Sequence, residues 1–135
     1  MANKIQGSVD TNVLLRLLLD DIHAQTKAAQ SLIDSGDRYE VADAALIEVV
    51  FVLEKIYSMD RALIMENVLA IVRNRTFICN RVLFEQVMPQ YVQEPSLSVV
   101  DCALLAYARL NKAVPLYTFD KKLIQKSGVD CQMPL

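Results

Sequence analysis

The sequence predicts an α/β fold in a single domain, and three observations lead to this prediction. Short β-prone segments alternate along the chain with longer segments of helix formers, an order typical of a mainly parallel sheet with helical crossovers. The chain has 135 residues, enough for one domain with its own core. Apolar residues make up 53% of it, with 3 Gly and 4 Pro, which excludes disordered and collagen-like classes. Without a repeat or linker, residues 1–135 form one expected domain.

Helices are expected where leucine, alanine and other helix formers follow a polar capping residue. Asp43 and Asp60 are the expected caps of two central helices, and Ser96 or Ser98 caps a later one. Pro89 is expected to kink or break the helix that contains it. The expected helices are residues 13–19, 23–34, 44–57, 61–73, 82–93, about 98–110 and 121–126.

Strands are expected in short runs of β-branched and aromatic residues between these helices. In a parallel sheet, ligand sites form beyond the carboxyl ends of the strands, so the residues that follow each strand are the first candidates for chemistry. The expected strands are residues 5–9, 39–42, 76–79, 114–117 and 129–133.

Charge, cysteine content and hydropathy limit the function classes. The net charge of −2 argues against a protein that binds duplex nucleic acid through its overall charge, although it allows a local group of residues to bind nucleic acid. Cys79, Cys102 and Cys131 contain no C-x-x-C pair, and His23 is the sole histidine, so neither a disulfide framework nor a zinc site is expected. The first residues lack an apolar leader and no stretch is long enough to span a membrane. We therefore expect a cytoplasmic protein.

Four acidic residues stand among apolar neighbours or directly after expected strands: Asp10, Glu48, Asp101 and Asp120. A carboxylate held among apolar residues costs several kcal/mol unless it is paired or bound to a cation. Each acid alone has a simpler explanation, because it can cap a helix or pair with its own lysine or arginine. Together they favour one shared site around a positive group.

The ligand type indicates the chemistry. A cluster of carboxylates without histidine or cysteine suits Mg²⁺ or Mn²⁺ rather than Zn²⁺. One or two such ions activate a water and stabilise the leaving oxygen of a phosphodiester. Glycine is too scarce for a phosphate-binding loop. With a single histidine, the sequence supports a Ser-His-Asp or Cys-His catalytic site far less well than it supports a carboxylate cluster.

Four segments carry a resemblance to a known family: VDTNVLLR at residues 9–16, Glu48 within an apolar helix, VDCAL at 100–104 and LYTFDKK at 116–122. Over nearly the whole chain and in this order, they resemble the PIN domain, and more narrowly the VapC-type toxins of type II toxin–antitoxin pairs. The resemblance implies a three-layer α/β/α sandwich with a short, mainly parallel five-stranded sheet. It also implies a Mg²⁺- or Mn²⁺-dependent endoribonuclease that forms a homodimer and is silenced by a cognate antitoxin protein.

The same resemblance implies roles for individual residues. Asp10, Glu48, Asp101 and Asp120 would be the catalytic, metal-binding acids. Asn12 and Thr118 would support them by hydrogen bonds that position Asp10, Asp120 and the reacting water.

Several basic residues are candidate contacts for RNA phosphates, because an acidic cleft needs nearby cations to hold an anionic substrate. Arg16, Lys121 and Lys122 lie next to the acids in sequence; Lys126 and the group Arg73, Arg75 and Arg81 are weaker candidates. The alternative for all of them is an ordinary solvated face. The helices expected at 44–57 and 61–73 carry apolar residues on nearly every side, so they are either deeply buried or form a dimer or antitoxin surface.

Two other functions compete with the ribonuclease. A HAD-type phosphatase also places an aspartate after its first strand, but it needs a second aspartate two positions later, where this chain has Asn12. A catalytically inactive PIN-like scaffold that binds RNA or a partner would keep its function after Asp10→Asn.

Overall fold

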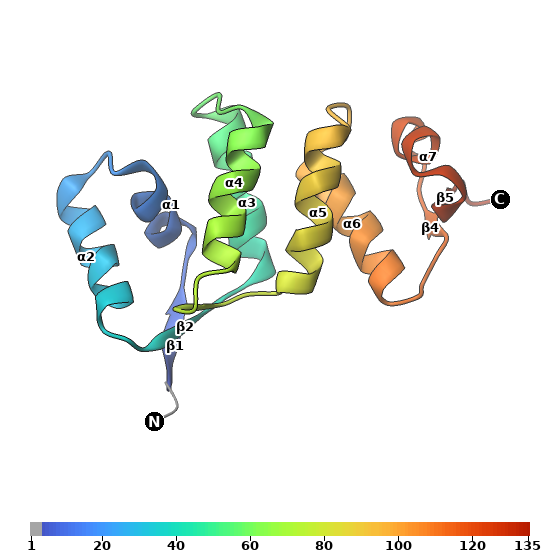
Figure 1. Cartoon of the computed structure of the whole chain (residues 1–135). Helices are drawn as coiled ribbons and strands as arrows, with labels where there is room; N and C mark the ends of the chain where they lie inside the picture. The colour runs from blue at the N-terminus through green and yellow to red at the C-terminus, as the bar shows by residue number, and fades with distance from the viewer. Residues whose placement is uncertain (1–3) are drawn as a thin grey trace. The chain divides into compact units, whose positions relative to one another are not determined.

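The computed structural model describes residues 4–135, which fall into two compact units. The first unit ends at Arg81 and the second spans Val82–Leu135. The first contains β1 (Ile5–Val9), α1 (Thr11–Leu19), α2 (His23–Asp34), β2 (Arg38–Val41), α3 (Asp43–Lys55), α4 (Arg61–Val72) and β3 (Phe77–Ile78) (Figure 1). The second contains nearly all of α5 (Arg81–Gln93), then α6 (Val99–Leu110), β4 (Leu116–Tyr117), α7 (Lys121–Ser127), a 3-10 turn (Gly128–Asp130) and β5 (Cys131–Gln132).

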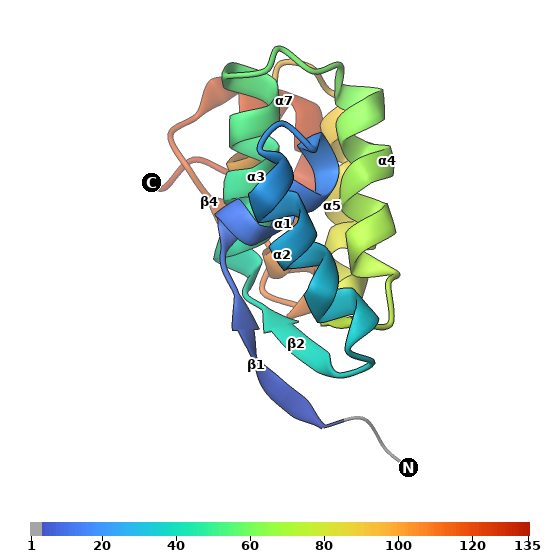
Figure 2. The same ribbon diagram turned by 90° about the vertical axis from the view of Figure 1, so that its left-hand side faces the viewer.

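The first unit is built on a parallel sheet in the order β1-β2-β3. Val9 pairs with Val41 and Tyr39 pairs with Phe77, so the three strands run in the same direction. Figure 2 shows β1 and β2 side by side, with α1 and α2 next to them. The residues that follow each strand therefore gather at one edge of this sheet, and Asp10 is the first residue after β1.

Branched apolar side chains hold the helices of the first unit together. Those with no exposed surface are Leu14, Leu46, Val49, Val50, Leu53, Ile64 and Val68. They come from α1, α3 and α4, so the element that begins beside Asp10 shares a core with the helix that carries Glu48. Burying each such side chain contributes about 1.5–3 kcal/mol of transfer free energy.

The second unit combines a short parallel pair of strands with three helices. Leu116 of β4 pairs with Cys131 of β5, and α6 and α7 pack against these strands. The most deeply buried side chains of this unit, at 0–2% exposure, are Leu83, Phe84, Val87, Met88, Tyr91, Leu97, Cys102, Leu105, Leu123 and Cys131. In Figure 1 the chain descends along α6 and returns along β4, so α6 starts at the end of the unit where β4 finishes.

The predicted α/β fold class is confirmed: residues 4–135 form a mixed α/β protein with seven helices and short parallel strands. The five strands occur at the five expected places, hydrogen-bonded in one group of three and one of two. Most helix ends lie within two residues of the predicted ones. None of the helices in residues 4–135 is long and apolar enough to cross a bilayer.

One local prediction was wrong. Asp43 is the first residue of α3 rather than its cap, because Ala42 holds the extended N-cap conformation. Of the two alternatives for Pro89, a break does not occur: α5 continues through the proline to Gln93 although the proline removes one backbone N–H. Of the alternatives for α6, Ser98 is the cap.

The cap of α6 is a reciprocal pair of hydrogen bonds. The Ser98 Oγ accepts from the backbone N–H of Asp101 at 3.1 Å, and the Asp101 Oδ2 accepts from the backbone N–H of Ser98 at 3.0 Å. Such a capping box satisfies two N–H groups that the helix itself cannot pair.

We expect Ser98→Ala to lower the free energy of unfolding by about 1 kcal/mol, because the N–H of Asp101 loses its acceptor. Ser98→Asp, which restores an acceptor, should recover most of the loss. Urea denaturation of the three proteins measures the difference. Equal midpoints for wild type and Ser98→Ala would contradict the assigned cap.

Candidate active site

Asp10 is exposed at the junction between β1 and α1, where it is the N-cap of the helix. Its Oδ1 accepts a hydrogen bond from the backbone N–H of Val13 at 3.1 Å. Its Oδ2 makes no hydrogen bond to residues 4–135. The cap therefore orients the carboxylate and leaves one oxygen available to a ligand.

Glu48 lies on α3, one helical turn after the point where α1 meets that helix. The hydroxyl of Thr11, the residue after Asp10, donates to the carbonyl oxygen of Ala45 at 3.4 Å. Glu48 is exposed, and its carboxylate has no ion-pair partner in the described chain. The first unit thus brings Asp10 and Glu48 to the same junction of two helices.

The far end of α1 is also attached to α3, through a short chain of polar contacts. The Arg16 Nη1 pairs with the Asp21 Oδ1 at 2.8 Å, and the hydroxyl of Tyr57, just beyond α3, donates to the Asp21 Oδ2 at 3.1 Å. With the Thr11 contact, α1 is joined to α3 at two places.

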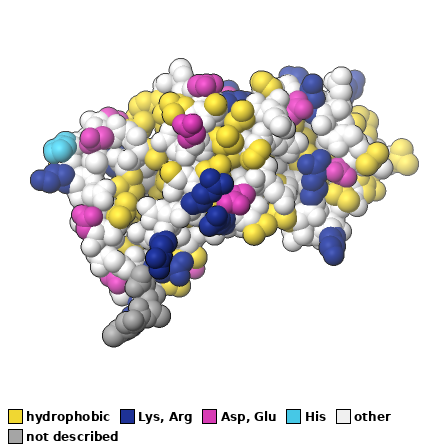
Figure 3. Space-filling view, in the orientation of Figure 1, with side chains coloured by type: hydrophobic (Ala, Val, Ile, Leu, Met, Phe, Trp, Pro, Cys, Tyr) yellow, Lys and Arg dark blue, Asp and Glu magenta, His cyan; other side chains and the backbone are white. Residues whose placement is uncertain are grey.

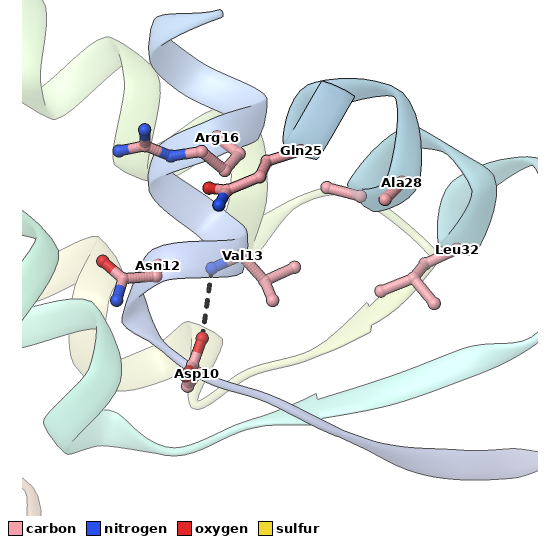
Figure 4. A pocket seen from close by; sticks show the side chains of 8 residues that line it. Asp10, Asn12, Val13, Arg16, Gln25, Ala28 and Leu32 are labelled. Carbon is pink, nitrogen blue, oxygen red and sulfur yellow. Dashed lines mark hydrogen bonds between the residues drawn. The ribbon is translucent and has the colours of Figure 1, made fainter. Parts of the chain in front are cut away.

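A hollow of about 380 Å³ lies beside Asp10, between α1 and α2 (Figure 4). Figure 4 shows Asp10 at the start of α1 and the side chains of Ala28 and Leu32 on the facing helix. Its lining residues are Asp10, Asn12, Val13, Arg16, Gln25, Ala28, Ala29 and Leu32. A mainly apolar recess with a few polar groups at one side suits part of an organic substrate.

The other two acids belong to the second unit, and both are held by helix caps. Asp101 uses Oδ2 in the capping box described above, which leaves Oδ1 unbonded within the described residues. Asp120 is the N-cap of α7, and its Oδ1 accepts from the backbone N–H groups of Lys122 at 2.9 Å and Leu123 at 3.2 Å. Each aspartate therefore keeps one oxygen available, as Asp10 does.

The two supporting residues are placed differently. The Thr118 Oγ1 accepts from the backbone N–H of Asp120 at 3.0 Å, so it fixes the turn that presents this aspartate. Asn12 is exposed in the first turn of α1, two residues after Asp10, and lines the hollow in Figure 4. Thr118 acts on the main chain of Asp120, and its hydroxyl makes no hydrogen bond to the Asp120 carboxylate among the described residues.

The four acids are less buried than the sequence argument that selected them assumed. Asp10, Glu48 and Asp120 are exposed and Asp101 is half-buried, so burial among apolar residues does not set them apart. The simpler alternative, a helix cap, describes all three aspartates. Capping and ligand binding are compatible here, because the caps occupy one oxygen of each carboxylate.

Carboxylate oxygens are the ligands that a divalent cation such as Mg²⁺ prefers, together with several retained waters. Within residues 4–135 there is no group of three or more His, Cys, Asp or Glu side chains arranged to hold a metal. The four predicted acids are divided evenly, with Asp10 and Glu48 in the first unit and Asp101 and Asp120 in the second.

Of the basic candidates, Arg16 is buried at 8% exposure and paired with Asp21, which occupies it structurally. Its Nε is buried without a hydrogen-bond partner in the described residues. Lys121 and Lys122 are exposed at the first positions of α7, directly after Asp120. Arg38, which the sequence analysis did not select, joins Arg73, Arg75 and Arg81 around a second hollow of the first unit.

The cysteines and the histidine have no place in this chemistry. Cys102 and Cys131 are buried free thiols, and Cys79 is a half-buried one. Burial raises the pKa of the Cys79 thiol to about 11, and the nearby Asp43 carboxylate adds to the shift. His23 is exposed at the first position of α2, near Asp20.

Comparison with known proteins gives one family. A sequence model of the PIN domain matches residues 8–129, a range that covers both units and all four acids. No curated protein matches the chain.

The raised pKa of Cys79 predicts a thiol that resists alkylation. In the folded protein iodoacetamide should modify Cys79 slowly from pH 7 to 9.5 and faster only as the pH approaches 11. Because the folded-state pKa is raised, the matching stabilisation is present below the unfolded pKa near 9 and is lost as the pH rises toward 11. Mass spectrometry of folded and urea-unfolded protein, with Cys79→Ser as control, measures both rates; equal rates at pH 8 would refute the assignment.

Proposed function

Because this chain belongs to the PIN domain family, whose members are generally metal-dependent nucleases, we propose that it is a Mg²⁺- or Mn²⁺-dependent endoribonuclease. It would hydrolyse RNA phosphodiester bonds as the toxin of a toxin–antitoxin pair. The two units would act as a single nuclease domain over residues 1–135, since the family match runs across the boundary between them.

The observation that carries the proposal is the geometry of the three aspartates. Asp10 and Asp120 are the N-caps of α1 and α7, and Asp101 lies in the first turn of α6. Each gives one carboxylate oxygen to a capping hydrogen bond, while the other oxygen stays unbonded among the described residues. A cap fixes the direction of the carboxylate before any ligand arrives, which reduces the entropy lost on binding. Three oxygens fixed in this way, together with the exposed carboxylate of Glu48, would supply oxygen donors for a divalent cation.

In this proposal Asp10, Glu48, Asp101 and Asp120 would hold the cation. When bound, the cation lowers the pKa of a water and stabilises charge on the leaving oxygen of the phosphodiester. Thr118 keeps the turn before α7 in place through the N–H of Asp120. Asn12 offers an amide to the reacting water or to the carboxylate of Asp10.

Substrate binding would use the groups beside these acids. Lys121 and Lys122 are exposed and follow Asp120 directly, so they can offset the negative charge of the acids and attract a phosphate. The hollow beside Asp10 would receive part of the RNA strand, with the Gln25 amide as a hydrogen-bonding group. Arg16 would contribute by holding α1 through Asp21 rather than by direct contact with phosphate.

Exposed apolar side chains and free cysteines support the proposed partners and location. Large apolar side chains of α3 and α4 remain exposed, with Phe51 at 54% and Leu63 at 46%. We assign this surface to a second copy of the chain, because both residues lie on neighbouring helices that could pair with the same helices of a copy. An antitoxin protein would cover the acids. Three free cysteines fit a reducing compartment such as the cytoplasm.

A second function competes on a specific observation. Helix capping alone would explain why aspartates occupy positions 10, 101 and 120. An inactive PIN-like scaffold that binds RNA or a partner would use them only in this structural role. Replacement by asparagine separates the two, because asparagine caps a helix as well as aspartate does but is a poor cation ligand.

Cleavage of total cellular RNA is the decisive measurement. We expect purified wild-type protein to give discrete fragments with Mn²⁺ and none with EDTA. Asp10→Asn and Asp101→Asn should each lower the rate by at least about 100-fold, because several kcal/mol of cation-based stabilisation is lost. Their free energies of unfolding should stay close to that of wild type, whereas Asp10→Ala should lose about 1 kcal/mol with its cap.

Asp60→Asn is the matched control. Asp60 is also an exposed N-cap residue, but its side chain makes no capping hydrogen bond and it belongs to none of the proposed sites. This variant should cut RNA at the wild-type rate. Unchanged cutting by Asp10→Asn would favour the scaffold, and fragments that persist in EDTA would indicate a contaminating nuclease.

The dimer proposal predicts a change in mass. Phe51→Asp combined with Leu63→Asp should convert a dimer into a folded monomer. Burying the two new carboxylates in the dimer interface would cost several kcal/mol, whereas in the monomer both positions are exposed to water. Light scattering after size exclusion measures the mass, and circular dichroism checks the fold. A wild-type monomer, or a dimer that survives both substitutions, would contradict the assignment.

A further inference from the structure

Four of the seven arginines of the chain line one hollow of about 250 Å³ in the first unit. The arginines are Arg38, Arg73, Arg75 and Arg81, and they share the hollow with Val72, Asn74, Phe77, Ile78 and Cys79. In Figure 3 dark blue side chains gather in this region, where α4 leads into β3. Such a concentration is unexpected in a protein with a net charge of −2.

Backbone contacts fix the positions of the central arginines. The Arg38 Nε donates to the carbonyl oxygen of Arg75 at 3.2 Å, and the backbone N–H of Tyr39 donates to the Thr76 carbonyl at 2.8 Å. The Asn74 Oδ1 accepts from the backbone N–H of Thr76 at 2.9 Å, which closes a tight turn between Arg73 and Arg75. The turn and the β2–β3 pairing therefore hold the backbone around Arg38 and Arg75, and the Arg38 side chain, in place without a ligand.

Two of the four guanidinium groups, those of Arg38 and Arg75, retain donors for an anion. Arg75 is exposed, and its side chain has no hydrogen bond or ion pair within residues 4–135. Arg38 uses Nε for the Arg75 carbonyl, which leaves its two terminal nitrogens. Cys79 stays a neutral thiol because burial raises its pKa to about 11, so it does not compete with an anion for the arginines.

We propose that this arginine hollow binds backbone phosphates of single-stranded RNA at a site apart from Asp10. Guanidinium groups bind phosphate through two parallel hydrogen bonds, and several of them around one recess suit a phosphodiester chain better than an isolated carboxylate. The choice of RNA as the ligand rests on the proposed nuclease function.

The sheet sets the spacing between this site and Asp10. Arg38 opens β2 and Arg75 precedes β3, whereas Asp10 follows the opposite end of β1. The pairing from Arg38 to Val41 spans roughly 10 Å at about 3.3 Å per residue. An RNA strand cut at Asp10 would therefore reach the arginines a few nucleotides from the cleaved bond, so a dinucleotide would be too short.

The test measures the affinity of the Asp10→Asn protein, which leaves the RNA intact, for a single-stranded RNA. An RNA of about 20 nucleotides is long enough to reach both Asp10 and the arginine hollow. Adding Arg75→Gln should weaken binding about 3- to 10-fold and reduce the slope of log K against log salt by about 0.7, as expected for one lost phosphate contact. Arg75→Lys should keep the slope and recover part of the affinity, since it retains the charge but loses the paired donors. Lys27→Gln, an exposed charge on α2, is the matched control and should change neither value.

Cleavage kinetics supply a second readout. Arg75→Gln should raise KM for the long RNA, leave kcat unchanged and leave cleavage of a dinucleotide unaffected. If wild type cuts nothing but the Arg75→Gln effect on binding and salt slope remains, the proposed nuclease function fails and the phosphate site stands. Binding and slope equal to those of the Lys27→Gln control would overturn the phosphate site. Unchanged RNA binding with weaker binding of a polyglutamate peptide would also overturn it and assign the hollow to an acidic protein segment.

Discussion

The hydrogen bond between an aspartate and the first N–H groups of a helix is the interaction on which the organisation of this protein depends. It occurs at Asp10, Asp101 and Asp120, each time near the end of a strand or the start of a helix. A helix start has unpaired N–H groups and a partial positive charge, both of which a carboxylate satisfies. The same bond holds the carboxylate in one orientation. Local helix stability and the presentation of acidic groups therefore have a common origin.

This double role shows that the sequence argument that selected these acids was incomplete. Apolar neighbours around Asp101 and Glu48 suggested buried charges, yet Glu48 is exposed and Asp101 is half-buried. Only some of the neighbours face the core, such as Val49 and Cys102, whereas Phe51 is exposed. Strand and helix positions were predictable, because α2 ends at Asp34 before Ser35-Gly36 and β-branched runs mark the strands. The N-cap of α3 was not predictable, because Ala42 adopts the cap conformation with its backbone alone and has no side chain that could accept a capping hydrogen bond.

Features made by distant segments lay beyond sequence reasoning. The arginine hollow needs β2 and β3 to pair in parallel, which brings Arg38 to the carbonyl of Arg75 across 37 positions of the chain. In sequence, Arg38 is an isolated charge at the start of a strand, and Arg73, Arg75 and Arg81 resemble a solvated turn. Similarly, nothing near Asp21 in sequence indicates that it connects Arg16 with Tyr57.

The double attachment of α1 has a consequence for ion selectivity. Thr11 holds one end of the helix to α3, and Arg16 holds the other through Asp21 and Tyr57, so motion of α1 about α3 is restrained at two places. If Asp10 and Glu48 share the proposed cation, these contacts would limit how far their backbones can adjust to the radius of the ion. Mg²⁺ requires near-ideal octahedral geometry at short distances, whereas the larger Ca²⁺ accepts flexible, irregular shells. Such a restraint would then favour cations of one size over another.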